Sequence, residues 1–160
     1  PYEMTLRPDD EALGFLVTDV ARLLRAEFDR AIAAESLGIT PGEARALSHV
    51  ARASPVRQAA LAERMGVEAM TLSTYLDRLE EQGLVLREAD PTDRRAKLVT
   101  TTEAATAVLA RIRAVGEAVR SDLEAGIPHA EWASFLATLK QLRANLWDKR
   151  QENTRTRPAA

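Results

Sequence analysis

The segment from residue 57 to residue 103 constrains most strongly how this chain can fold. Its pattern predicts, in order, a short helix, a turn, a second helix, a strand, a charged loop and another strand. Gly66 lies between the two predicted helices, where a left-handed residue permits a sharp turn, and Gly83 ends the second helix in the same way. The segment therefore predicts a helix-turn-helix followed by a β-hairpin.

The second helix, predicted over residues 68–82, has two different faces when side chains are placed at about 100° per residue. Its apolar stripe consists of Ala69, Leu72, Leu76 and Leu79 and is expected to pack on the preceding short helix. The opposite face carries Met70, Thr71, Thr74, Asp77, Arg78 and Glu81, with Ser73 and Tyr75 on the flanks. This pattern predicts a helix with one face in the core and the other exposed.

Two β-prone runs, residues 84–86 and 96–101, flank the charged loop at residues 89–95. Asp90-Pro91 in this loop is a turn signal, and Val56 is a candidate for a short third strand. The expected fold class is mainly α with a small β-hairpin wing.

Capping signals set the expected starts of two further helices. Thr40 and Glu43, with Pro41 between them, form a capping box that begins a helix ending near Arg52. Thr102 is expected to cap a later helix whose first turn holds an acidic residue, Glu103.

The 160 residues are expected to form a single domain. Its central lobe, residues 40–102, holds the helix-turn-helix and the wing. Long amphipathic helices are predicted at residues 10–36 and within residues 103–150, and residues 151–160 are expected to be disordered. The long helices have more apolar face than one chain easily buries, which predicts a homodimer through both chain ends. The alternative is that these faces close a monomeric bundle.

Three motifs in this order, LAERMGV, LDRLEEQGLV and DPTDRRAKLVT, resemble those of the MarR family of winged helix-turn-helix transcriptional regulators. The chain departs from the family pattern at three positions. Glu68 stands where serine is frequent, Thr74 where arginine is common, and Thr101 where leucine is usual.

The resemblance implies a sequence-specific DNA-binding regulator, expected to be a repressor, that acts as a homodimer on a pseudo-palindromic operator in double-stranded DNA. It also implies release of the DNA by a small aromatic or phenolic effector, bound where the dimerisation helices meet the winged-helix lobe.

The charge balance requires that a DNA-binding surface be built by separating the two signs. The net charge is −2, and residues 57–103 hold seven Arg or Lys against nine Asp or Glu. The basic side chains expected to face DNA are Arg57, Arg78, Arg94, Arg95 and Lys97. The acids expected to face away are Glu63, Glu80, Glu88 and Glu103.

Candidate contacts to bases lie near the start of the second helix, where the hydroxyl groups of Thr71, Ser73 and Thr74 suit base edges or phosphates in the major groove. Ordinary solvated helix surface is the alternative. Arg78 is expected either to bind a phosphate or to pair with a nearby acid.

Candidate contacts outside that helix are three arginines. Arg94 and Arg95 at the wing tip suit a narrow minor groove, and the expectation is that one of them is held by Asp93 while the other contacts DNA. Salt bridges to Asp90 or Asp93 are the alternative. Arg57 is a candidate phosphate ligand.

Other functional classes lack support in the sequence. No cysteine is present, and neither His49 nor His129 has neighbours at metal-ligand spacing, so no metal, cofactor or catalytic residue is expected. No apolar run is long enough to cross a membrane, no signal peptide pattern begins the chain, and the expected compartment is the cytoplasm. The acidic balance also suits an alternative function, a winged-helix module that binds another protein instead of DNA.

Overall fold

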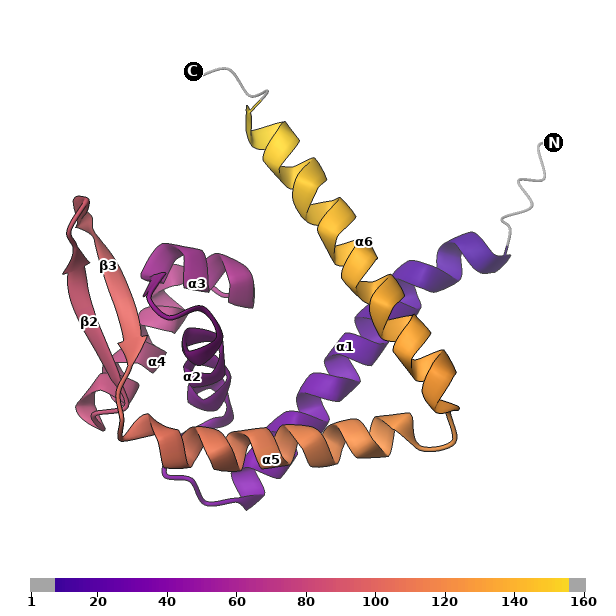
Figure 1. Cartoon of the computed structure of the whole chain (residues 1–160), viewed down its shortest axis with the longest axis horizontal. Helices are drawn as coiled ribbons and strands as arrows, with labels where there is room; N and C mark the ends of the chain where they lie inside the picture. Colours follow the sequence, from indigo (N-terminus) through magenta and orange to yellow (C-terminus); the bar gives the residue numbers. More distant parts are fainter. Residues whose placement is uncertain (1–7, 156–160) are drawn as a thin grey trace. The chain divides into compact units, whose positions relative to one another are not determined.

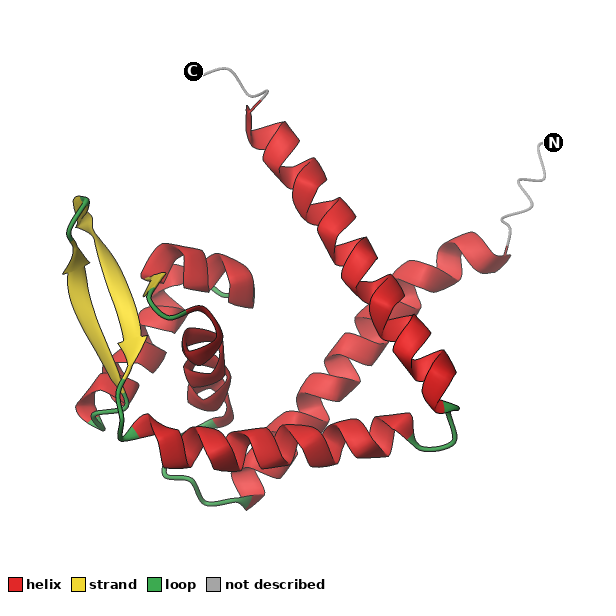
Figure 2. Cartoon of the chain, in the orientation of Figure 1, coloured by secondary structure: helices red, strands yellow, loops and turns green. Residues whose placement is uncertain are grey.

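The computed structural model describes residues 8–155 and divides the chain into two units, residues 1–119 and 120–160. Helices dominate both units, and three short strands lie in the first (Figures 1 and 2). The elements are α1 (Pro8–Ala34), α2 (Pro41–Ala53), β1 (Val56–Arg57), α3 (Gln58–Met65), α4 (Ala69–Glu81), β2 (Val85–Asp90), β3 (Asp93–Thr101), α5 (Ala105–Glu124) and α6 (His129–Arg155). Among the described residues, no helix is both long enough and apolar enough to cross a membrane.

The start of α2 confirms the predicted capping box. The Glu43 amide donates to Thr40 Oγ1 at 3.2 Å, and the Thr40 amide donates to Glu43 Oε2 at 3.0 Å. Pro41 is the first helical residue, where its missing amide proton costs no hydrogen bond. Two N–H groups that the helix cannot satisfy internally are thus satisfied reciprocally.

The core of the first unit lies beneath α4. Leu72, Leu76 and Leu79 of this helix are fully buried, together with side chains of α2, α3 and the sheet. The prediction of the apolar stripe is wrong at Ala69, which is exposed. This alanine is the first residue of α4 and lines an open groove beside the wing, so solvent reaches it. Glu68 is the residue before the helix and makes no capping bond with its side chain.

The three strands form an antiparallel sheet in the order β1-β3-β2. Val56 pairs with Val99, which confirms the expected third strand. The hairpin is longer than predicted, because β2 and β3 extend through most of the expected charged loop and leave only residues 91–92 between them. Polar residues are compatible with these strands because the outer part of the hairpin stands away from the helices (Figure 1).

Two other expected boundaries are wrong. The Thr102 hydroxyl donates to the Gly83 carbonyl at 2.6 Å instead of capping a helix, so α5 begins at Ala105 and Glu103 precedes its first turn. At the other end, α6 continues to Arg155. The segment 151–155 contains no glycine or proline to stop a helix, whereas residues 156–160, the rest of the expected disordered tail, lie outside the described residues.

His49 lies half-buried on α2 close to three arginines. Burial of the imidazole lowers the pKa of His49, and the charges of Arg52, Arg64 and Arg45 lower it further. The folded protein therefore favours the neutral form of this side chain more than the unfolded chain does.

We expect Thr40→Ala to lower the free energy of unfolding by about 1 kcal/mol, because the substitution removes the cap and leaves the buried Glu43 with one partner fewer. Urea unfolding followed by circular dichroism measures this change. Thr154→Ala is the matched control, since that hydroxyl only donates back to the Arg150 carbonyl within α6. An equal loss in both variants would contradict a specific role for the cap.

We also expect acid to destabilise the fold through His49. The contribution of its neutral form to stability is fully present above about pH 6.5, the ordinary histidine pKa, and is lost as the pH falls through the lower pKa of the folded state. His49→Gln should flatten the dependence of the melting temperature on pH below neutrality. His129→Gln should leave that dependence intact, and identical profiles for the two variants would exclude His49 as its source.

Candidate nucleic-acid interface

The outward face of α4 is set by the turn before the helix and by the leucines beneath it. Gly66 ends α3 in the left-handed conformation, with φ of 62°, and the Val67 amide donates to the Ala62 carbonyl at 3.2 Å. With the three leucines buried, the opposite face of the helix turns to solvent. As predicted, Met70, Thr71, Thr74, Asp77, Arg78 and Glu81 are exposed.

The hydroxyl groups on this helix differ in what they can offer a ligand. Thr71 is exposed and Ser73 is half-buried on the flank of the helix. The Thr74 hydroxyl donates to the Met70 carbonyl at 3.1 Å, so its proton is used within the helix and its oxygen is left as an acceptor. Thr71 is therefore the freest donor at the front of α4.

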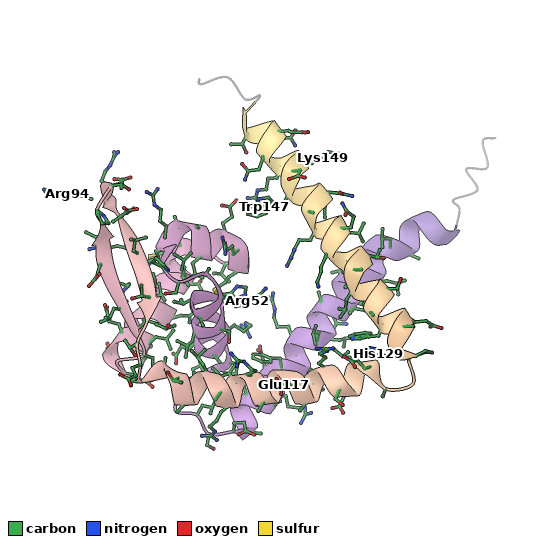
Figure 3. The ribbon with its side chains drawn as sticks, in the orientation of Figure 1. Arg52, Arg94, Glu117, His129, Trp147 and Lys149 are labelled. Atoms are coloured by element: carbon green, nitrogen blue, oxygen red, sulfur yellow. The ribbon has the colours of Figure 1, made fainter. Side chains whose placement is uncertain are left out.

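The wing arginines lie in an irregular part of the hairpin. Ala89 pairs with Lys97, but the next residue of β2, Asp90, pairs with Asp93. Arg94, Arg95 and Ala96 consequently have no opposite residue in β2, and the register shifts at this bulge. Bulges of this kind redirect side chains away from the regular ladder. Figure 3 shows Arg94 at the tip of the hairpin, pointing away from the helices.

The two wing arginines differ in how they are held. The backbone amide of Arg95 donates to Asp93 Oδ1 at 3.1 Å, and the Arg95 Nε atom lies 3.6 Å from the same oxygen. Arg94 is exposed, and it forms no ion pair with any side chain in the described part of the chain. The pairing agrees with the expectation that Asp93 holds one arginine, and contact of the other with DNA stays a prediction.

An arginine that the sequence analysis did not single out pairs with two acids of α4. Arg87 of β2 places Nη2 2.5 Å from Asp77 Oδ1 and 2.7 Å from Glu80 Oε2, and its Nε donates to Glu80 at 3.1 Å. The hydrogen bond from Arg87 is the main cause that lowers the pKa of Glu80. Two of the acids nearest the exposed face of α4 are thus paired with a cation.

Arg57 does not simply point to solvent. Its Nε donates to Asp90 Oδ2 at 2.7 Å, and its Nη2 contacts the Thr92 hydroxyl at 3.3 Å. The Asp90 side chain is only 7% exposed, whereas that of Arg57 is 50% exposed. The sequence predicted a phosphate ligand here, and the structure places most of the guanidinium's bonding on the wing.

Arg78, by contrast, is exposed on α4, and within residues 12–154 no acid lies at ion-pair distance from it. The alternative in which Arg78 pairs with a neighbouring acid is therefore not what the structure shows. Its side chain borders a hollow beside Tyr75 and Thr74. This position leaves the guanidinium available to a ligand approaching α4.

A groove of about 510 Å³ separates the wing from α3 and α4. Ala62, Ala69 and Leu72 line it from α3 and α4, Arg57 lies at the start of α3, and the wing contributes Arg95 and Lys97 together with Asp93. The groove places cations of the wing across from the first turn of α4. A polyanion lying along α4 would therefore meet positive charge at the wing.

Comparisons with known proteins agree with this architecture. Residues 37–96 match the family model described as the MarR family. The chain is 33% identical over 105 residues to a protein from Thauera aromatica whose name links it to transcriptional regulation of the hcr operon. The match takes in 66% of this chain and 63% of that protein, so the chain spans just under two thirds of that relative's length.

Solved structures extend the similarity to most of the chain. The crystal structure of the transcriptional regulator PA3341 is 38% identical, with a TM-score of 0.71, covering 84% of this chain and 98% of that one. A transcriptional regulator of the MarR family from Silicibacter pomeroyi is 31% identical, with a TM-score of 0.71 and coverage of 82% and 88%. Because sequence identity, fold and the order of the motifs agree over most of its length, the chain belongs to the MarR family of transcriptional regulators.

Proposed function

We propose that this protein binds double-stranded DNA in a sequence-specific manner and regulates transcription, as a repressor, from a pseudo-palindromic operator. Two features observed together carry the proposal. The outward face of α4 is polar and exposed, and the wing tip presents Arg94, which has no ion-pair partner among the described side chains. Regulators of this family bind DNA as dimers, which supports the same conclusion.

The proposed docking places the first turns of α4 in the major groove. Thr71, Ser73 and Thr74 then lie nearest the base edges, and Arg78 lies nearest a phosphate. Arg94, within the bulge, reaches toward the adjacent minor groove, where the narrow walls strengthen the negative potential. Arg95 contributes charge next to it.

The net charge of −2 is compatible with DNA binding because three of the acids near this surface are locally paired. Arg87 holds Asp77 and Glu80, and Asp90 is buried under Arg57 and Thr92. Exposed cations without such partners then dominate the potential that a phosphate meets at the wing tip. A mixed overall charge weakens long-range attraction to DNA but leaves these short-range contacts in place.

The proposal includes a homodimer, because the long helices leave large apolar side chains in solvent. Leu16 on α1 is 61% exposed and Leu146 on α6 is 69% exposed. The other large apolar residues of these two helices that stand in solvent are Leu13, Phe15, Val17, Val20, Leu23, Leu24, Phe135, Leu139, Leu142 and Trp147. Contiguous apolar faces of this extent are typical of surfaces that a partner covers. A second copy is the partner that would also supply the second α4.

The proposal also includes an aromatic or phenolic effector. A hollow of about 510 Å³ lies between the end of α1, the start of α2 and α4. Ile32, Leu37 and Ile39 give it an apolar wall, while Tyr75 and Arg78 of α4 offer an aromatic ring and a cation. A small aromatic anion bound there would touch the helix proposed to contact bases. It would weaken DNA binding if it favoured a placement of α4 that fits the groove poorly.

We expect Arg94→Ala to weaken binding of a duplex selected from random-sequence DNA about 5- to 150-fold, since arginine contacts to DNA contribute roughly 1–3 kcal/mol. The slope of log affinity against log salt should fall by about one. Fluorescence anisotropy at two salt concentrations measures both. Arg113→Ala, at an exposed position of α5, is the matched control and should change neither. Unchanged affinity for Arg94→Ala would remove the wing from the interface, and failure of the wild type to select any duplex would favour a protein-binding module.

We expect sedimentation equilibrium at micromolar concentration to give twice the 17.6 kDa mass of one chain. Leu16→Glu should shift the protein toward monomer, because burying a charge in an apolar interface is costly. Leu86→Glu introduces the same change at an apolar residue that is 50% exposed on the wing, and it should leave the dimer intact. A monomeric wild type would overturn the two-site geometry of the operator.

A further inference from the structure

Arg57 occupies a junction between the helix-turn-helix and the wing. It is the last residue of β1 and the residue that precedes α3, and its backbone pairs with Leu98 of β3. Its side chain extends to the other end of the hairpin, where Nε and Nη2 both lie 2.7 Å from Asp90 Oδ2. One side chain therefore joins the start of the first motif helix to the last residue of β2.

The carboxylate of Asp90 is satisfied from both sides. Its Oδ1 atom accepts from the Thr92 amide at 2.9 Å and from the Thr92 hydroxyl at 2.8 Å. That hydroxyl accepts in turn from Arg57 Nη2 at 3.3 Å, which closes a ring of three residues. These hydrogen bonds, from Thr92 first and then from Arg57, lower the pKa of Asp90. A carboxylate that is 7% exposed requires such partners, because an unpaired buried charge is strongly destabilising.

The ring lies where the hairpin departs from regular pairing. Asp90 is opposite Asp93, and the bulged residues Arg94 and Arg95 follow immediately. The backbone holds β1 to the sheet through only two residue pairs. The direction in which the bulge leaves the sheet is thus fixed by side-chain bonds to Asp90 as well as by the ladder.

We propose that Arg57 is a positioning residue that sets where the wing tip, and with it Arg94, stands relative to α4. The ring of Arg57, Asp90 and Thr92 carries the proposal, which rests on the proposed DNA-binding function. Arg57 then acts on DNA affinity through the wing, in place of the direct phosphate contact that the sequence suggested.

Asp90→Asn should change DNA affinity in opposite directions for the two possible roles of Arg57, phosphate ligand and positioning residue. If Arg57 were a phosphate ligand, removing the negative charge would free the guanidinium and take an acid away from DNA, so affinity would rise. If Arg57 positions the wing, the weaker bond to the neutral amide loosens the turn, so affinity falls. Arg57→Lys adds a second distinction. Lysine keeps the charge that a phosphate needs but lacks the planar fork that reaches Asp90 and Thr92 together.

The experiment measures DNA affinity for the full-length protein with the duplex that the wild type selects from a random pool. We expect Asp90→Asn, Arg57→Lys and Arg57→Ala each to weaken binding about tenfold. The salt slope of Arg57→Lys should fall by about one, as in Arg94→Ala, whereas a lysine that replaced a phosphate ligand would keep the slope. On the Arg94→Ala background, each should weaken binding by less than about twofold, because the residues act through one contact. Tighter binding by Asp90→Asn, or effects that multiply with Arg94→Ala, would overturn the proposal.

A measurement without DNA keeps this inference separate from the proposed function. Amide hydrogen exchange at residues 92–95 of the free protein should accelerate about tenfold in Asp90→Asn and Arg57→Ala, with the α2–α4 core unchanged. Thr92→Val removes only the hydroxyl of the ring and should also accelerate exchange at residues 92–95. This variant provides the test if either charge variant fails to fold. Unchanged exchange at the wing turn in Thr92→Val and the folded charge variants would show that the ring does not hold the wing, whatever the DNA result. Failure of the wild type to bind DNA, with accelerated exchange in the variants, would overturn the proposed function and with it the role assigned to Arg57 in binding.

Discussion

Burial of three leucines on α4 fixes most of what the rest of this molecule can do. Leu72, Leu76 and Leu79 are fully buried, and each contributes roughly 1.5–3 kcal/mol on removal from water. Their shared stripe determines how α4 is rotated about its axis, and so which side chains face outward. A polar residue in this stripe would lower stability and also destroy the interface, because the threonines and Arg78 have no independent means of orientation. The orientation of the side chains proposed to contact DNA therefore depends on the packing of these leucines.

The second constraint is that acidic residues close to a surface proposed to bind phosphate must be neutralised. Seven basic residues against nine acidic ones in residues 57–103 would not by themselves attract DNA. Arg87 and Arg57 resolve the difficulty by pairing with Asp77, Glu80 and Asp90. These pairs span separate elements, α4 with β2 and β1 with the wing turn, so the same bonds that neutralise the acids also join the wing to the helices.

Local signals were enough to predict much of the fold, and long-range pairs were not. The capping box at Thr40 and the left-handed Gly66 depend on residues within a few positions of each other, and both were predictable. Arg87 bonds across the turn at Gly83, and Arg57 bonds to Asp90 from 33 positions away, so neither pair leaves a periodic signal. The hairpin was predicted too short because its outer part has little core beneath it and lacks alternating apolar residues. The outward residues of α4 followed from periodicity alone, whereas their contacts with DNA remain predictions.

The arginines in and near the wing fall into two groups, those that pair with acids on other elements and those that do not. A two-stranded hairpin is marginally stable by itself, and the outer half of this one has little core beneath it. Arg87 at its base and Arg57 near its turn each bond an acid on another element, and substitution of either would leave those acids without a paired cation. Arg94 and Arg95 carry no comparable structural duty, since Asp93 is half-buried and bonds the Arg95 backbone in any case. Substitutions at Arg94 and Arg95 can therefore change binding with little effect on folding. The ion pairs of Arg87 and Arg57 restrict substitution at the base of the hairpin and near its turn.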